Sequence, residues 1–172
     1  STESAIIAGT GNTIPNSTEY SVIVGSENST NNAERGGIYS SKSSTINNNT
    51  AGVVVGGESN VTGTGGYYNG VFAGQSNTAA GIHSVVVGGT NNETTSAADR
   101  SVIIGGTGND ISNDGSVILG GQGNTITFRN SAIIGGKNNS NDADGGVICG
   151  GSNNELLGDG NGHGIFAGND NE

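Results

Sequence analysis

The segment Gly105-Gly106-Thr107-Gly108-Asn109-Asp110 has the residue order of a calcium-binding turn, Gly-Gly-x-Gly-x-Asp. Such turns surround each ion with backbone carbonyls and Asp carboxylates, and they need the Asp in every turn of a nonapeptide repeat. Related segments of this chain instead recur every 15 to 17 residues, mostly without a carboxylate at the position of Asp110. The equivalent positions include Thr13, Thr78, Glu93, Thr125, Ser140 and Glu155. We therefore predict no calcium array, and no other metal or cofactor site.

Catalysis on a polysaccharide would need positioned carboxylates that act as acid, base or nucleophile. The loop acids do not recur as a pair and do not lie beside a His; they are Glu34, Asp99, Asp114, Asp142, Asp144 and Asp159. His83 and His163 occupy different repeat positions without a ligand cluster, so we interpret them as surface residues. A Gly-rich phosphate loop would need a following helix, and no helical period is present. We predict that the chain is not an enzyme.

The composition also excludes several classes of partner. The 172 residues carry a net charge of −10, and their five basic residues are scattered, whereas phosphate binding needs clustered Lys and Arg. We therefore predict no nucleic-acid binding. No apolar run approaches the ~20 residues that span a membrane, so no membrane insertion by this segment is expected. Cys149 is the only cysteine, which excludes an intrachain disulfide. The sequence starts without Met or a secretory signal pattern, and we interpret it as a fragment of a longer fibrous protein.

The chain is organised around the stretch 101–109, Ser-Val-Ile-Ile-Gly-Gly-Thr-Gly-Asn. Near copies occupy 116–124 and 131–139, and alignment on the second small residue gives eleven copies over residues 1–172. This register leaves no room for a second domain. An apolar triplet bounded by Ser and Gly is typical of a β-strand, and repeated triplets can stack into one continuous core. The sequence therefore predicts an all-β fold, a single parallel β-roll or β-solenoid of eleven 15–17-residue repeats.

The middle position of the triplet is the strictest, because only Ile or Val occurs there. We predict that this column fills the interior of the coil. Successive side chains of a strand point to opposite faces, yet the positions on either side are also apolar in all eleven copies. Both faces should then be buried, the second one against identical chains; a monomer with a covering element is the alternative. The predicted structural core is Ile6, Ile23, Ile38, Val54, Val71, Val86, Ile103, Ile118, Ile133, Ile148 and Ile165.

An Asn follows the small pair in nine copies, with Ser29 and Ser44 in the other two. Asn tolerates left-handed backbone geometry and can bond its own turn, so this column should form a corner, where stacked Asn side chains can also pair. A second apolar position predicts a second short strand; it holds Ile14, Ile46, Ile111, Ile126 and Leu156. Each repeat should therefore be strand, corner, short strand and variable loop. The predicted corner residues are Asn12, Asn60, Asn77, Asn92, Asn109, Asn124, Asn139, Asn154 and Asn171.

The pattern Ser-[Val/Ala]-Ile-[Ile/Leu/Val]-Gly-Gly-x-x-Asn resembles the head repeats of YadA-like trimeric autotransporter adhesins, which carry Ser-Val-Ala-Ile-Gly units at a slightly shorter period. It is even more similar to the Ile-Ile-Gly-Gly-x-x-Asn repeats of bacteriophage tail fibres and of fibre-like proteins of large viruses. The resemblance covers all eleven copies and implies a homotrimer of left-handed parallel β-rolls, with apolar columns packed inside and between chains. The doubled Gly and the Asn column replace the Ala-rich corner of the adhesins and favour the viral fibre.

Exposed aromatic residues are the candidates for contact with a partner, because Tyr and Phe are enriched at interfaces. Tyr67 and Tyr68 lie in one loop, and Phe128 and Arg129 follow the short strand at Ile126; packing on a neighbouring chain would explain them equally well. We expect a structural and adhesive viral fibre segment at the virion or cell surface, which associates with itself and contacts a host-surface glycan or protein. A bacterial adhesin head and a portion of a polysaccharide-degrading tailspike are the alternatives.

Overall fold

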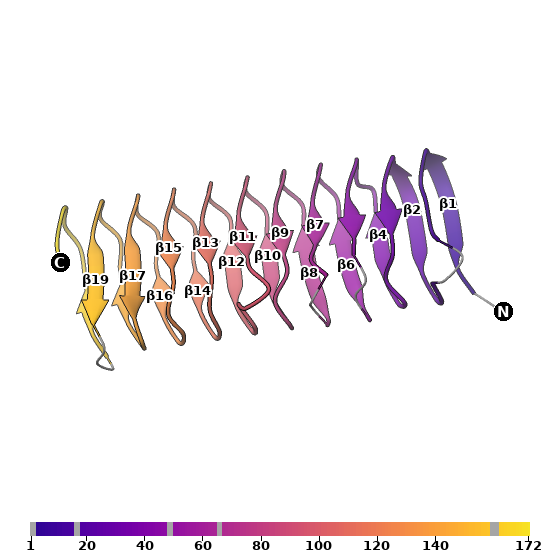
Figure 1. Ribbon diagram of the computed structural model, residues 1–172. Coiled ribbons are helices and arrows are strands. Elements are labelled where there is room, and N and C mark those ends of the chain that lie inside the picture. Colours follow the sequence, from indigo (N-terminus) through magenta and orange to yellow (C-terminus); the bar gives the residue numbers. More distant parts are fainter. Residues whose placement is uncertain (1–2, 16–17, 48–49, 65–66, 159–161) are drawn as a thin grey trace.

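The computed structural model describes residues 3–15, 18–47, 50–64, 67–158 and 162–172. Within these residues every helix-or-strand element is a β-strand, and every strand pair is parallel. Each repeat forms one coil, and the coils stack into a rod whose two chain ends lie at opposite ends (Figure 1). The prediction of an all-β parallel solenoid is confirmed.

Two sheets run along the rod, and a coil contributes one strand to each of them. The first sheet has eleven strands: β1 (Ala5–Thr10), β2 (Val22–Glu27), β4 (Gly37–Tyr39), β6 (Gly52–Val55), β8 (Asn69–Phe72), β10 (Val85–Val87), β12 (Val102–Ile104), β14 (Val117–Ile118), β16 (Ala132–Ile133), β18 (Val147–Ile148) and β20 (Gly164–Ile165). The second sheet has nine: β3 (Thr30–Asn31), β5 (Thr45–Ile46), β7 (Val61–Thr62), β9 (Thr78–Ala79), β11 (Glu93–Thr94), β13 (Asp110–Ile111), β15 (Thr125–Ile126), β17 (Ser140–Ala143) and β19 (Glu155–Gly158).

The register between coils follows the repeat alignment. In the first sheet, Val86 pairs with Ile103, and Ile103 pairs with Ile118. In the second sheet, Ile111 pairs with Ile126. A third ladder of single bridges joins the residue after the small pair of each coil to its neighbours, and Thr107 belongs to it. The varying repeat length therefore leaves all three ladders in register.

The middle residue of each triplet points into the coil. From Ile23 to Ile148 the nine residues of this column are completely buried. Ile6 differs from this pattern, because it is 48% exposed in the first coil, and Ile165 is only partly buried in the last one. A residue in an end coil has a neighbouring coil on one side only, so half of its packing is missing. Within this chain Ile6 is therefore not part of the buried core that the sequence predicts.

The second sheet supplies the opposite wall of the interior. Ile46, Ile111 and Ile126 are completely buried there, and Leu156 nearly so, whereas Ile14 lies outside the named strands and packs at the edge of the core. A Ser ladder closes one side of the interior: Ser116 N–H donates to Ser101 Oγ at 3.1 Å. The interior is therefore a narrow space in which the Ile/Val column of the first sheet faces a mixed wall of the second sheet, where Asn31, Thr62, Thr94 and Asn141 are also completely buried.

The Asn column lines the interior at the corner instead of facing solvent. Asn109 N–H donates to Asn92 Oδ1 at 3.0 Å, and Asn124 N–H donates to Asn109 Oδ1 at the same distance. The Nδ2 group of Asn109 also donates to the carbonyls of Gly105 and Gly121. Asn60 to Asn154 are at most 1% exposed. Each side chain thus links the corners of neighbouring coils, and the rung-to-rung pairing is confirmed.

The left-handed residue of the corner is not this Asn but its predecessor, which corrects the sequence interpretation. The residue before the ladder Asn has a positive φ, 54° at Asn91 and 52° at Asn138. The corner Asn points its side chain into the interior, and the chain therefore turns at the residue before it. An Asn or Ser in that position adopts left-handed geometry at modest cost, and Gly108 adopts it at none.

The second Gly of the pair is required by the Asn three residues later. Gly106 has φ of +84°, and a Cβ placed there would lie 2.4 Å from Asn109 Nδ2 and 2.4 Å from the carbonyl oxygen of Gly121. In the two coils without a corner Asn, both the Gly and the Asn are replaced by Ser. Ser26 and Ser41 stand at the Gly position, and Ser29 and Ser44 stand at the Asn position. A shorter side chain at the Asn position leaves room for a side chain at the Gly position.

Candidate interaction surface

The outward face of the first sheet carries an apolar strip that we call the outer stripe. It comprises the first and third residues of the triplets, which point away from the interior. The first column holds Ala5, Val22, Gly37, Val53, Gly70, Val85, Val102, Val117, Ala132, Val147 and Gly164; the third holds Ile7, Val24, Tyr39, Val55, Phe72, Val87, Ile104, Leu119, Ile134, Cys149 and Phe166. No charged residue occurs in either column.

The outer stripe is substantially exposed in the single chain. Ile104 and Ile134 are each 48% exposed, and Leu119 is 44% exposed. Eleven strands spaced ~4.8 Å apart and three residues of ~3.3 Å give a strip of about 50 by 10 Å. This is at the upper end of the largest apolar patches on monomeric proteins, which are often functional. The sequence predicted burial of both faces, and within the described residues no element of this chain covers the second one.

An open hollow of about 240 Å³ lies on the stripe, and Gly70 of β8 is among the residues that line it. Val53 of β6 and Val85 of β10 flank it along the rod, and the rings of Tyr68 and Phe72 lie at its sides. It is smaller than the ~300–1,000 Å³ typical of small-molecule sites, and its lining is almost entirely apolar. A hydrophobic side chain fits this environment better than a polar ligand does.

The outward column of the second sheet is polar. It holds Thr30, Thr45, Val61, Thr78, Glu93, Asp110, Thr125, Ser140 and Glu155. Glu93 and Asp110 are direct neighbours on β11 and β13. Partial burial and, to a lesser extent, the charge of Glu93 raise the pKa of Asp110 above its ordinary value of 3.8, while a hydrogen bond from Ser112 opposes the rise. Asp110 Oδ1 is itself buried without a hydrogen-bond partner.

Tyr67 and Tyr68 lie at the side of the outer stripe. Tyr68 precedes the strand position of its coil, and His83 occupies the same position one coil further on. Their rings stack with centroids 5.5 Å apart and planes 18° apart, and His83 N–H donates to the carbonyl of Tyr67. Tyr68 and His83 therefore occupy equivalent positions of two successive coils. Both residues have left-handed backbone geometry, with φ of 57° at Tyr68 and 58° at His83.

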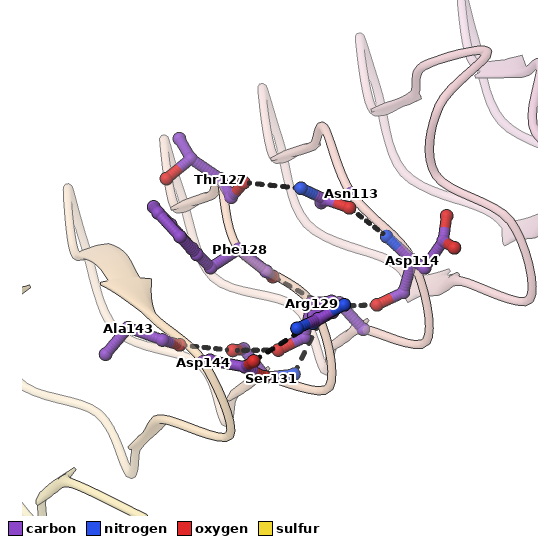
Figure 2. Close-up of polar contacts among 9 residues, drawn as sticks. Asn113, Asp114, Thr127, Phe128, Arg129, Ser131, Ala143 and Asp144 are labelled. Atoms are coloured by element: carbon purple, nitrogen blue, oxygen red, sulfur yellow. Dashed lines mark hydrogen bonds and ion pairs between the residues drawn. The ribbon is translucent and has the colours of Figure 1, made fainter. Parts of the chain in front are cut away.

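Phe128 and Arg129 lie on the loop side of the coil and are engaged within the chain (Figure 2). Arg129 Nε donates to Asp144 Oδ2 of the next coil at 2.9 Å. The carbonyl of Phe128 accepts a hydrogen bond from Ser116 Oγ, while its ring remains 43% exposed. Arg100 and Asp114 form a comparable but longer contact of 3.7 Å. These exposed pairs contribute little to stability, and their shared role is to connect successive loops.

Other candidate chemistry is sparse in the part of the chain that the structure describes. There, no group of three or more His, Cys, Asp and Glu side chains could hold a metal ion, and no helix is long and apolar enough to cross a membrane. The loop acid Asp159 lies outside the described residues. Among the described acids, Asp142 and Asp144 face Thr127 and Arg129 of the preceding coil. The arrangement places these two carboxylates in contacts between loops.

Comparison of the chain with protein-family models, with curated proteins and with solved structures finds no match. The functional conclusion therefore depends on the geometry of the chain. Of the two outward faces, only the outer stripe combines length, apolar composition and exposure, so it is the candidate site.

Proposed function

We propose that this chain is a non-enzymatic structural segment of a viral fibre, which associates with identical chains through the outer stripe into a homotrimeric shaft or head. The observation that carries this proposal is the apolar outward face that continues through all eleven strands of the first sheet. Each half-exposed aliphatic side chain that becomes buried contributes on the order of 1 kcal/mol, before the cost of association is subtracted. A second copy offers the same strip at the same spacing.

The interior of the coil suits a shaft. The parallel strand ladders, the buried Ile/Val column and the corner ladder of Asn and Ser side chains continue through the central coils, so each coil stabilises the next one. The loops carry the irregular residues, among them Phe128, and these are the positions at which a host-surface glycan or protein would be contacted. The resemblance to fibre repeats, especially the doubled Gly and the Asn corner, supports a location on the virion surface.

The mass of the protein in solution tests this proposal. Sedimentation equilibrium should give three times the chain mass of 16.8 kDa at micromolar concentration. A stable monomer would contradict self-association. A second assay addresses the non-enzymatic part: incubation with capsular polysaccharides should leave their chain length unchanged, and release of shorter chains would instead support a tailspike.

A further inference from the structure

The chain contains six copies of the triplet Asn-x-Ser/Thr, the acceptor sequence for an N-linked sugar. A transferase must reach both the Asn amide and the hydroxyl two residues later, so both groups have to lie on the outside of the protein. Two of the six triplets, at Asn16 and Asn48, include residues outside the described part of the chain. The coil sorts the other four, because two of them start at one corner position and two start at the next.

Two triplets start at the inward corner residue and lie in the interior. Asn60 and Asn92 belong to the Asn column, and both are completely buried, as are Thr62 and Thr94 two residues later. The Nδ2 groups of the two Asn residues donate to corner carbonyls of the following coil at 3.1 Å. Since the Asn column forms the corner in most coils, these two triplets are a by-product of the fold. A sugar on either amide would have to occupy the interior.

Two other triplets start at the residue before the Asn column, and they face outward. Asn28 and Asn138 are exposed and have positive φ, 50° and 52° respectively. Their hydroxyl residues, Thr30 and Ser140, belong to the outward column of the second sheet. The Nδ2 groups of the two Asn residues donate to exposed side-chain oxygens at 3.4 Å, which is long for a hydrogen bond. Each triplet thus presents its amide and its hydroxyl on the outside of one coil.

The fold does not require these outward triplets. Ser59 and Gly108 occupy the position of Asn28 in other coils, and Val61 occupies the position of Thr30. The coil therefore forms without an amide or a hydroxyl at these positions. A sugar at this corner would also lie outside the columns of the outer stripe, so its attachment is independent of the proposed self-association.

We propose that Asn28 and Asn138 are acceptor sites for an N-linked sugar on the folded protein, and that Asn60 and Asn92 are not. In the transfer, a bond forms between Asn Nδ2 and the anomeric carbon of a nucleoside-diphosphate sugar, while the bond from that carbon to the diphosphate oxygen breaks. The nucleoside diphosphate leaves with the electron pair, and the amide proton passes to a base of the transferase. The enzyme acts on the folded chain, because sugars added before folding would also reach Asn60 and Asn92 and block the Asn ladder.

Mass spectrometry of proteolytic peptides tests this assignment. The folded protein would be incubated with UDP-glucose and a soluble transferase specific for Asn-x-Ser/Thr, and synthetic peptides of the four triplets would give the rates without a fold. Asn28 and Asn138 should each gain a hexose. Asn60 and Asn92 should react at least about a hundredfold more slowly than their peptides, since a buried core opens rarely. Failure of Asn28 or Asn138 to react when its peptide does, or rapid reaction at Asn60 or Asn92, would overturn the proposal.

A single substitution compares the two corner positions side by side. Glu93→Thr gives the exposed Asn91, which has φ of 54°, a hydroxyl two residues later, while the buried Asn92 keeps its own at Thr94. Thr125 already stands in this outward column, so the coil should fold. The variant should gain a hexose at Asn91 and none at Asn92. A hexose on Asn92, or on neither residue, would contradict sorting by the coil.

The matched loss is Thr30→Val, because Val61 occupies the same column in another coil. This variant should keep the parent circular dichroism spectrum and lose the hexose at Asn28, while Asn138 reacts as before. Continued reaction at Asn28 would show that the outward hydroxyl of Thr30 is not part of the acceptor site and would overturn its assignment.

Discussion

The two outward faces of the coil belong to the same repeats, yet they have opposite chemistry. The outward column of the second sheet holds Thr, Ser, Glu and Asp with a single Val, whereas the outer stripe holds no charged residue in any coil. Both faces are built by parallel strands with the same spacing. The coil therefore folds with a polar outward face, and the apolar composition of the other face is not a requirement of the fold. This contrast is the main reason to assign the outer stripe to a partner.

The largest effect is expected when a charge enters the interior of the first sheet. Ile103 is completely buried and Ile104, its neighbour, is 48% exposed. Ile103→Asp would bury an unpaired carboxylate beside the aliphatic column and should cost more than about 4 kcal/mol, which abolishes folding. Far-UV circular dichroism and urea unfolding would measure this. Cooperative unfolding near the parent midpoint would show that the inner column is assigned to the wrong face.

A smaller effect is expected at the corner, where Gly and Asn are exchanged as a pair. Ser44→Asn alone would place an amide against Ser41, and we expect a loss of about 1–3 kcal/mol from overpacking. Ser41→Gly combined with Ser44→Asn restores the corner of the other coils and removes Ser41 Oγ, which is buried without a partner. The double variant should be at least as stable as the parent. If the effects of Ser41→Gly and Ser44→Asn on the free energy of unfolding were simply additive in a double-mutant cycle, coupling between the two positions would be excluded.

The polar outward face can be probed at Asp110. Its pKa is raised in the folded state, so the native chain binds its proton more tightly than the unfolded chain, and stability falls as pH rises through this range. Asp110→Thr, the residue present at Thr125 in the next coil, should stabilise the protein at neutral pH by a few tenths to about 1 kcal/mol. Thermal melts at neutral pH and below pH 3.8 would show the gain shrinking in acid. A gain independent of pH would point to packing instead of charge.

The smallest effect is expected on the bridge ladder. Thr107 is exposed, and Lys42 and Lys137 occupy equivalent positions in other coils. Thr107→Lys should change the free energy of unfolding by less than about 0.5 kcal/mol, as is usual for surface substitutions. Chemical denaturation would measure this. A loss as large as that of an interior variant would mean that the ladder position is not equivalent between coils.

Much of the fold follows from the sequence because every coil repeats the same physical constraints. The Ile/Val column locates the interior, the positions of Ile111 and Ile126 locate the second strand, and the Asn column locates the corner. The sequence does not show which corner residue has left-handed backbone geometry, because this depends on which of two adjacent residues turns its side chain into the interior. The structure is also needed to explain why Ser26 replaces the Gly in the same coil in which Ser29 replaces the Asn. In the other coils the Asn Nδ2 atom fills the space that a side chain at the Gly position would need.

The interaction surface is predicted less completely than the fold. Apolar residues in all three triplet columns indicate a second buried face, but a sequence does not place a hollow over Gly70. The pairing of Tyr68 with His83 could be found by aligning the residue before each strand, because both residues occupy that position. Ile6 matches the inner column and is nevertheless 48% exposed, because among the described residues only one coil packs against it.

The most direct test of the central claim compares the mass of the parent with that of a variant of the outer stripe. Ile104→Asp combined with Ile134→Asp places two charges on the stripe at exposed positions, so the coil should keep its circular dichroism spectrum. Light scattering after size-exclusion chromatography should give a multiple of 16.8 kDa for the parent and the single-chain mass for the variant. Equal masses for the two proteins would contradict assembly through the outer stripe.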